Sequence, residues 1–303
     1  MAAGQVFQVA GLVLRVAEVG DSDRMLTVLT AEEGKLSVFA RGAKKLNGSS
    51  LSACQPLAYA LFTLRRGREY SYLRESTTKE TFHALCGSLS AQALAAYFCE
   101  IAETVSYPGG EARDLLQLTL NALWVLAEGK KPEALVKASF ELRAAALDGY
   151  LPDLRFCCSC GRESLPEGAV LDIMNGRLFC GDCFRKLYPV AGERGDGPET
   201  DGEGTALRPL RVSGETLQAM RYILSAPARR QFAFAVSDRA GRNLSQACEQ
   251  YLFHHVGHGF PALSYYRQTG EFSRSLEAAA KKLRQNAEKP QDDGIVPDIG
   301  EEM

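Results

Sequence analysis

Four cysteines in the middle of the chain form two pairs of identical spacing, Cys157 with Cys160 and Cys180 with Cys183. The full pattern is C-x2-C-x19-C-x2-C. A C-x2-C pair fits a tight turn that directs both sulfurs toward one point, and two such turns together supply four thiolates in a tetrahedron, which suits zinc. The spacing therefore predicts one zinc ion held by these four side chains.

A zinc ion with four thiolate ligands stabilises structure, because a catalytic zinc keeps one position open for water. The metal is expected to support a small module at residues 151–190 that would be unfolded without it. The apolar residues of this module are few: Leu154, Phe156, Leu171, Ile173, Leu178, Phe179 and Phe184. The alternatives are ordinary buried cysteines or a redox-active pair, and Cys158 could replace Cys157 as a ligand.

A second concentration of chemically useful groups lies between Lys35 and Arg74, where eight basic residues accompany a single acid, Glu69. Cationic groups bind phosphates and aromatic rings stack on bases, so their combination is typical of a surface that binds single-stranded nucleic acid. The alternative is a solvated basic face over a core that contains the rings. The basic residues are Lys35, Arg41, Lys44, Lys45, Arg65, Arg66, Arg68 and Arg74, and the aromatic ones are Tyr59, Phe62, Tyr70 and Tyr72.

No set of residues in the sequence forms a catalytic arrangement. Gly34 and Lys35 are followed by Leu36, and Leu29 stands where a P-loop would need its first glycine, so no bound nucleotide is expected. The residues themselves therefore predict no catalytic site.

Two other polar clusters are interpreted as structural. His254, His255 and His258 lie near a helix end without an H-E-x-x-H motif, and they are expected to pack or to face solvent. Glu100 and Glu103 are expected on the solvent face of a helix.

The first 80 residues, which carry the basic stretch, are predicted to form five short strands. Apolar residues alternate along residues 6–19, 24–30, 35–41, 56–65 and 69–75. Turn signals separate the strands, and a polar loop at Gly42–Ser52 precedes the fourth. Five closely connected strands favour a small closed β-barrel of the OB-fold type, which we expect to be a nucleic-acid-binding domain at residues 1–80.

Apolar residues recur at helical spacing on both sides of the cysteines, which predicts an α-helical domain built from residues 81–150 and 207–284. The fold class is therefore multidomain α+β, with the zinc module inserted into the helical domain. Residues 191–206 are rich in glycine and acids and are predicted to be a disordered loop. Residues 285–303 contain six acids and one lysine and are predicted to be a disordered acidic tail.

Composition adds few constraints. The formal net charge of −2 does not identify a partner, and no run of about 18 apolar residues predicts a membrane span. The N-terminus lacks the basic region of a signal peptide. Cys54, Cys86, Cys99 and Cys248 are interpreted as free buried thiols, which favours a reducing cytoplasm.

In its order of features the chain resembles the bacterial RecO family of recombination mediators. The resemblance covers most of residues 5–260 and is specific in the first 80 residues and in the cysteine module. The segments that carry it are Gly11-Leu12-Val13-Leu14-Arg15, Gly20-Asp21-Ser22-Asp23, Thr30 with Gly34-Lys35-Leu36-Ser37, Arg41-Gly42-Ala43-Lys44-Lys45, Gln55-Pro56-Leu57 and Leu64-Arg65-Arg66-Gly67. A helical block and the paired C-x2-C motifs follow in the order typical of the family.

The resemblance implies a protein that is not an enzyme. Such proteins bind single- and double-stranded DNA and anneal complementary strands. With the partner RecR, such proteins help RecA to replace single-strand binding protein (SSB) on gapped DNA. By motif, Arg41, Lys44 and Lys45 would hold phosphates. The helical domain would present an apolar groove with basic neighbours to the acidic, apolar C-terminal tail of SSB. The expected location is the cytoplasm, at the nucleoid.

The sequence departs from the family pattern in three places. Leu46-Asn47-Gly48-Ser49 follows Lys44-Lys45, where the family usually has another basic residue and a serine. Gly257-His258-Gly259-Phe260-Pro261 interrupts the C-terminal segment, where a continuous helix is expected. The acidic stretches at 192–204 and 285–303 are additions that could screen a DNA site. The competing interpretations are an RNA-binding OB/zinc-ribbon protein without a repair role, and a zinc-dependent hydrolase.

Overall fold

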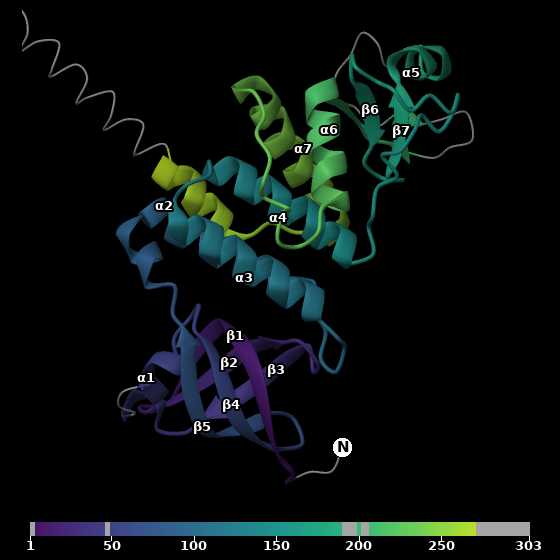
Figure 1. Cartoon of the computed structure of the whole chain (residues 1–303). Helices are drawn as coiled ribbons and strands as arrows, with labels where there is room; N and C mark the ends of the chain where they lie inside the picture. The colour runs from purple at the N-terminus through teal and green to yellow at the C-terminus, as the bar shows by residue number, and fades with distance from the viewer. Residues whose placement is uncertain (1–3, 46–48, 190–198, 201–205, 271–303) are drawn as a thin grey trace, which may run out of the picture.

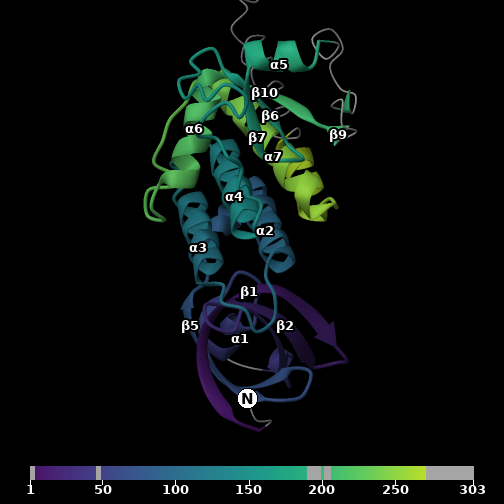
Figure 2. The ribbon, with the colours of Figure 1, turned by 90° about the vertical axis from the view of Figure 1, so that its right-hand side faces the viewer.

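The computed structural model describes residues 4–45, 49–189, 199–200 and 206–270. These form a β-barrel at one end, a bundle of helices in the middle and a small sheet with its own helix at the other end (Figures 1 and 2). No helix within the described residues is long and apolar enough to span a membrane. The predicted α+β architecture is confirmed.

Five strands close the barrel in the order β1-β2-β3-β5-β4, which is the predicted OB-type topology. They are β1 (Val6–Val19), β2 (Asp23–Thr30), β3 (Lys35–Ala40), β4 (Tyr59–Arg66) and β5 (Ser71–Glu80). All neighbours pair antiparallel except β3 and β5, which pair in parallel. Alternating side chains such as Val38, Phe62 and Leu64 fill the interior.

The predicted loop at 42–52 contains helical turns, which is a correction to the sequence analysis. A 3-10 turn covers Ala43–Lys45, and a short helix, α1, covers Ser49–Ala53. The turn and helix form because Ala43, Ala53 and Cys54 are buried in the barrel core. The tertiary burial of three small side chains therefore organises a segment whose composition is that of a loop.

Three consecutive helices and two later ones make up the bundle, close to the predicted ranges. They are α2 (Leu89–Thr104), α3 (Arg113–Glu128), α4 (Glu133–Leu147), α6 (Gly214–Ser225) and α7 (Asp238–Val256). Ser88, Ser213 and Ser237 each cap a helix by accepting a backbone N–H bond three residues ahead. After Gly257, whose φ of +78° ends α7, residues 261–270 are helical again.

Buried charges connect the helices of the bundle. The Lys137 ammonium of α4 lies 2.8 Å from the carboxylates of both Glu141 and Glu249, and the Tyr97 hydroxyl of α2 donates to Glu141. Burial raises the pKa of Glu141 to about 7, although Lys137 and Tyr97 act in the opposite direction. Removing one partner would leave the others charged and buried, so this network holds α2, α4 and α7 together.

The cysteine module, defined here as residues 151–189 with strand β10, packs directly on the bundle. Its sheet has the order β10-β6-β7, and α5 (Gly181–Leu187) follows β7. The strands are β6 (Ala169–Asp172), β7 (Arg177–Cys180) and β10 (Pro209–Val212), the last of which the sequence did not predict. Leu171 and Leu178 on one face belong to the bundle core, whereas Val170 and Phe179 on the other face pack with Phe184 of α5.

The two predicted acidic segments fall largely outside the described residues. Residues 285–303 lie outside them entirely, as do 190–198 and 201–205. Two short strands, β8 (Glu199–Thr200) and β9 (Ala206–Leu207), pair antiparallel within and beside the predicted disordered loop. The predicted disorder of residues 191–206 therefore stays a prediction.

A backbone contact joins the barrel to the bundle. The turn between β2 and β3 lies against the loop between α2 and α3, where Gly34 forms a β-bridge with Pro108 and the Lys35 N–H donates to the Tyr107 carbonyl oxygen at 3.2 Å. Gly34 has a φ of +61°, and a Cβ atom there would lie 2.2 Å from the Tyr107 oxygen. Only glycine fits this contact.

We expect Gly34→Ala to lower the melting temperature by at least about 3 °C more than Gly20→Ala does. Both positions have positive φ, but a Cβ at Gly20 meets nothing within 4 Å. Both variants carry a backbone strain of about 1 kcal/mol from the positive φ. The difference between their melting temperatures therefore measures the clash of the Gly34 Cβ with the Tyr107 oxygen. Equal shifts in thermal unfolding would contradict a tight contact at Gly34.

Candidate metal centre and nucleic-acid interface

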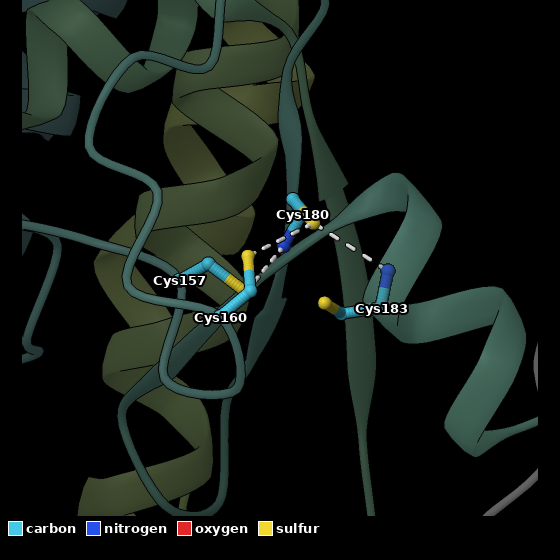
Figure 3. A group of neighbouring side chains, drawn as sticks. All are labelled: Cys157, Cys160, Cys180 and Cys183. Atoms are coloured by element: carbon cyan, nitrogen blue, oxygen red, sulfur yellow. Dashed lines mark hydrogen bonds between the residues drawn. The ribbon is translucent and has the colours of Figure 1, made fainter.

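The four predicted cysteines converge where β7 ends and α5 begins. The sulfurs of Cys157, Cys160, Cys180 and Cys183 all lie within 4.8 Å of one another. Cys157 and Cys160 come from a turn, Cys180 from the end of β7 and Cys183 from α5 (Figure 3). The group could hold a metal ion.

Backbone N–H groups favour the thiolate form of Cys157 in this cluster. The N–H of Cys180 donates to the Cys157 sulfur at 3.2 Å, and the N–H of Cys183 donates to the Cys180 sulfur at 3.4 Å. Burial alone would raise the pKa of Cys157, but N–H groups of Cys180, Cys160 and Ser159 outweigh it and lower that pKa to about 6. Thiolates are the form in which cysteine binds metals, so the donor set fits a cation.

The structure also decides between the two neighbouring candidates at the first turn. Cys158 is exposed and its backbone N–H pairs with the Leu178 carbonyl, so its side chain lies outside the cluster. Cys157 is fully buried and lies inside it. Of the four cysteines interpreted as buried free thiols, Cys86 is exposed, which corrects that prediction.

The eight basic residues divide into two groups by their contacts. Within the described part of the chain, Arg41, Lys45, Arg68 and Arg74 are exposed and have no ion pair. Lys44 forms one exposed ion pair with Glu18 at 3.0 Å, which is worth little and leaves the ammonium available. These five cations face solvent.

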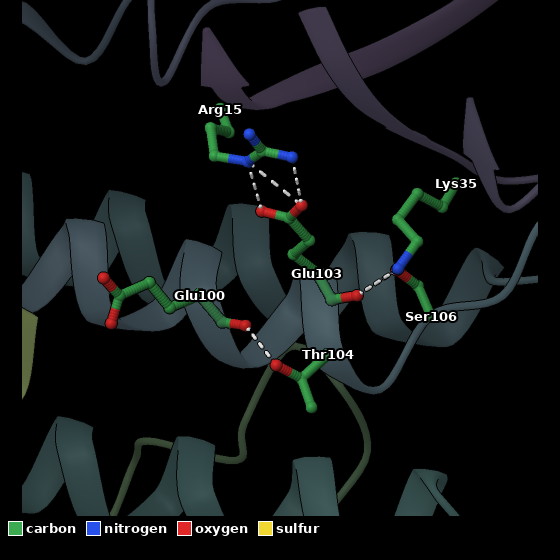
Figure 4. Close-up of polar contacts among 6 residues, drawn as sticks. All are labelled: Arg15, Lys35, Glu100, Glu103, Thr104 and Ser106. Carbon is green, nitrogen blue, oxygen red and sulfur yellow. Dashed lines mark hydrogen bonds and ion pairs between the residues drawn. The ribbon is translucent and has the colours of Figure 1, made fainter. Parts of the chain in front are cut away.

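The other three basic residues are engaged by the protein itself. The Arg66 guanidinium is largely buried, lies 2.9 Å from the Glu33 carboxylate and covers the Phe7 ring. The Arg65 guanidinium lies 4.7 Å above the centre of the Tyr72 ring. Lys35 donates to the backbone oxygen of Glu103 at 2.5 Å, so its ammonium joins the barrel to α2 (Figure 4).

The two glutamates assigned to the solvent face of α2 have structural contacts, which corrects that expectation. Glu103 accepts hydrogen bonds of 2.9–3.1 Å from the Arg15 guanidinium of β1 (Figure 4). Glu100 accepts the backbone N–H of Ala262 at the start of the last described helix. Neither contact could be predicted, because each joins segments more than 80 residues apart.

The aromatic residues of the basic stretch also divide by burial. Phe62 lies in the barrel core and Tyr59 packs against the bundle. Tyr70 and Tyr72 lie on the outer surface of the barrel with Phe39, where the three ring centres are 5.2–6.1 Å apart. Phe39 was missed, although the inward alternation of Val38 and Ala40 already placed it outward.

Two of these rings and the Arg65 guanidinium lie side by side on the outer surface of the barrel. Tyr72 pairs with Phe39 on one side and with Arg65 on the other, so the three side chains form a row across β3, β5 and β4. Arg68 lies in the β4–β5 connection beside this row. OB folds bind oligonucleotides on this part of the barrel, with the β2–β3 face and the β1–β2 and β4–β5 loops.

The basic loop after β3 is held beside the β1–β2 turn. The Lys44 N–H donates to the Ser22 carbonyl oxygen at 3.0 Å, and the Gly42 N–H donates to the Asp23 carboxylate at 2.7 Å. Arg41, Lys44 and Lys45 are therefore positioned at the edge of the face that carries the rings. We name the row together with Arg68 and these three residues the basic aromatic face.

The three histidines near the end of α7 do not form a metal site among the described residues. The His255 ring stacks on the Tyr150 ring, with 4.2 Å between the ring centres, and it also contacts the Tyr251 ring. Packing therefore accounts for it, as expected from the sequence.

Comparison with known proteins gives a consistent result. The family profile described as Recombination protein O N terminal matches residues 1–82, and the one described as Recombination protein O C terminal matches residues 86–264. The DNA repair protein RecO of Desulforudis audaxviator is 31% identical over 87% of this chain and 97% of its own length. The protein of the same name from Anaeromyxobacter dehalogenans is 32% identical over 87% and 96% of the two chains. That from Pelotomaculum thermopropionicum is 28% identical over 91% and 99%.

We expect Cys180→Ser to lose the bound metal and to lower thermal stability, because one thiolate of a closed shell is removed where the sheet packs on the bundle. Cys158→Ser is the matched control, because Cys158 is next to Cys157 but outside the cluster. This variant should keep the bound metal and the melting temperature. Metal content by mass spectrometry and a melting curve are the measurements. A Cys180→Ser protein with stoichiometric metal and the melting temperature of the unsubstituted protein would refute the site.

Proposed function

The chain belongs to the RecO family, and from this premise we propose that it is a mediator of recombinational DNA repair. It binds single- and double-stranded DNA, anneals complementary strands and, with RecR, helps to load RecA onto single-stranded DNA coated by SSB. It acts by binding and not by catalysis, requires no nucleotide and works in the cytoplasm at the nucleoid.

The observation that carries the proposal is the basic aromatic face. Rings of Phe39, Tyr70 and Tyr72 offer stacking surfaces for bases, and each stacked base contributes about 1–3 kcal/mol to binding. The surrounding cations supply phosphate contacts that carry no base information. Binding by both means is tolerant of sequence, as an annealing protein requires.

Lys35 and Arg66 belong to the proposed DNA site by charge, but their contacts give them a second role. Each already binds an oxygen within the protein, Lys35 a backbone carbonyl and Arg66 the Glu33 carboxylate. We propose that both shape the barrel, while the exposed Arg74 and the basic aromatic face contact the phosphates.

We propose that the metal is a single structural zinc ion. In a tetrahedral zinc site with Zn–S bonds of about 2.3 Å, the sulfurs are about 3.8 Å apart. The Cys160 and Cys180 sulfurs are separated by 3.8 Å, which fits that geometry. The ion would connect the turn at Cys157–Cys160 to β7 and α5.

We propose three functional units along the chain. Residues 1–80 are the DNA-binding OB domain, residues 81–150 and 207–284 form the helical domain, and residues 151–190 form the zinc module, to which β10 contributes a strand. The helical domain would dock the acidic, apolar C-terminal tail of SSB.

We expect Lys44→Ala combined with Lys45→Ala to weaken single-stranded DNA binding and to flatten its salt dependence. Each lost phosphate contact should reduce the slope of log K against log salt by about 0.7.

Tyr72→Ala should weaken binding at least fivefold with an unchanged slope, because stacking releases no counterions. Tyr265→Ala, an exposed tyrosine on the last described helix, is the control. Unchanged slopes for the double lysine variant would refute the phosphate contacts.

Annealing of complementary strands coated with SSB tests the proposed function as a whole. We expect the protein to accelerate annealing and to lose this effect when the SSB tail is deleted, because it must bind both DNA and SSB. No acceleration, together with equal or tighter binding to matched RNA, would favour an RNA-binding protein without a repair role.

A further inference from the structure

An apolar groove lies where the segment after α4 passes the C-terminal end of α6. It encloses about 900 Å³. Pro152 and Leu154 are buried at its base, Leu151 is 65% exposed, and Phe156 and Leu224 are half-buried. Exposed leucine next to a hollow of this size is typical of a surface that binds an apolar side chain.

Arg221 lines the groove, and Arg143 lies next to it, against the carbonyl oxygen of Leu224. Neither forms an ion pair within the described residues, although the Asp114 carboxylate interacts electrostatically with Arg143. Arg221 of α6 donates to three backbone oxygens at 2.7–3.0 Å, and Arg143 of α4 donates to three others at 3.0–3.1 Å. The acceptors are those of Leu154, Arg155 and Glu163 for Arg221, and those of Ile223, Leu224 and Ala226 for Arg143. Carbonyl oxygens satisfy the N–H groups without cancelling the positive charge.

Two more cations follow the C-terminal end of α6, which forms one side of the groove. Arg229 and Arg230 follow α6, are exposed and have no ion pair within the described residues. Arg155 pairs with its neighbour Asp153 at 2.9 Å, and Glu163 is the other acid at the groove. The charges that line the groove balance, so the excess comes from its neighbours. Counted together, five arginines (Arg143, Arg155, Arg221, Arg229 and Arg230) exceed the three acids Asp114, Asp153 and Glu163, which favours a partner that is both acidic and apolar.

The chain itself contains such a segment beyond the last described residue. Residues 291–303 read QDDGIVPDIGEEM, with five acids and no base. Its apolar side chains, Ile295, Val296, Ile299 and Met303, alternate with the acids in groups of one or two. No other stretch of this length in the chain combines five acids, no base and three branched aliphatic residues.

We propose that residues 291–303 bind this groove within the same molecule and occupy it in competition with external acidic peptides. Ile295, Val296 and Ile299 would contact Leu151 and Leu224, and the acids would face the arginines. The inference concerns this surface alone and does not depend on DNA binding.

The length of the chain permits the contact. Twenty residues, 271–290, separate Gly270 from the proposed segment, and they can span up to about 70 Å. The 15-residue helix α4, which runs along the bundle to the groove, is only about 22 Å long. A segment attached in this way has an effective concentration near 1 mM, so an intrinsic Kd of about 100 μM would reduce the affinity for external peptide about tenfold.

The test measures binding of a fluorescent peptide with the sequence of residues 291–303 to the full-length protein. A tail variant, Val296→Asp with Ile299→Asp, should bind the added peptide about tenfold more tightly than the unsubstituted protein. Adding Leu151→Asp should abolish the gain. Leu89→Asp changes a similarly exposed leucine at the start of α2; it is the matched control and should leave the gain intact.

Three outcomes would overturn the proposal. One is equal peptide affinity of the unsubstituted protein and the tail variant, and another is equal loss from Leu151→Asp and Leu89→Asp. The third is a groove that binds the SSB tail peptide but not the 291–303 peptide, which would assign the surface to SSB alone. The DNA-binding prediction at Lys44 and Lys45 is unaffected by any of these results.

A photo-crosslinker at Ile299 distinguishes binding within one molecule from binding between two. We expect crosslinks to residues 151–156 or 221–225 in the monomer band. Crosslinks found only in a dimer band, or only on the barrel, would overturn the intramolecular contact.

Discussion

The contact between the β2–β3 turn and the α2–α3 loop determines how the barrel sits on the bundle. At Gly34 two backbones approach so closely that no side chain fits between them. The Arg15–Glu103 ion pair and the bond from Lys35 to the Glu103 carbonyl lie beside this contact (Figure 4). An exposed ion pair adds little stability, so the packed backbone, with Leu12, Leu14 and Leu29 buried in the bundle core, supplies most of it.

The barrel is joined to the bundle through the β2–β3 turn, and the proposed nucleic-acid interface lies on the outer surface of β3, β5 and β4. Lys35 and Arg66 bind oxygens within the protein, whereas Arg41, Lys45 and Arg68 lie exposed around the rings of the outer surface. Basic residues that look alike in the sequence therefore differ in the structure. Those with an oxygen of the protein nearby bind it, and the others stay exposed to solvent. This division leaves exposed rings and cations on the outer surface, as the proposed binding of DNA requires.

The cysteine cluster matters for more than the module that contains it. The sheet that follows Cys157 and ends at Cys180 buries Leu171 and Leu178 in the bundle core, so loss of the metal would loosen the helices as well. The same segment supplies one wall of the groove next to α6. A metal site, a bundle core and a peptide-sized groove therefore depend on a common piece of chain.

The sequence by itself determined the repeating and local features. Alternation predicted the five strands, helical spacing predicted the bundle, and C-x2-C spacing predicted which four cysteines converge, because each pattern reflects the geometry of a few neighbouring residues. The tertiary structure alone decided contacts between distant segments. It buried Ala53 and Cys54 and so formed α1, and it recruited β10 to the cysteine module. It also brought Glu103 into an ion pair with Arg15, and it placed Cys157 and not Cys158 in the cysteine cluster. Neither contact follows from the sequence, because partners far apart in the chain meet only after folding.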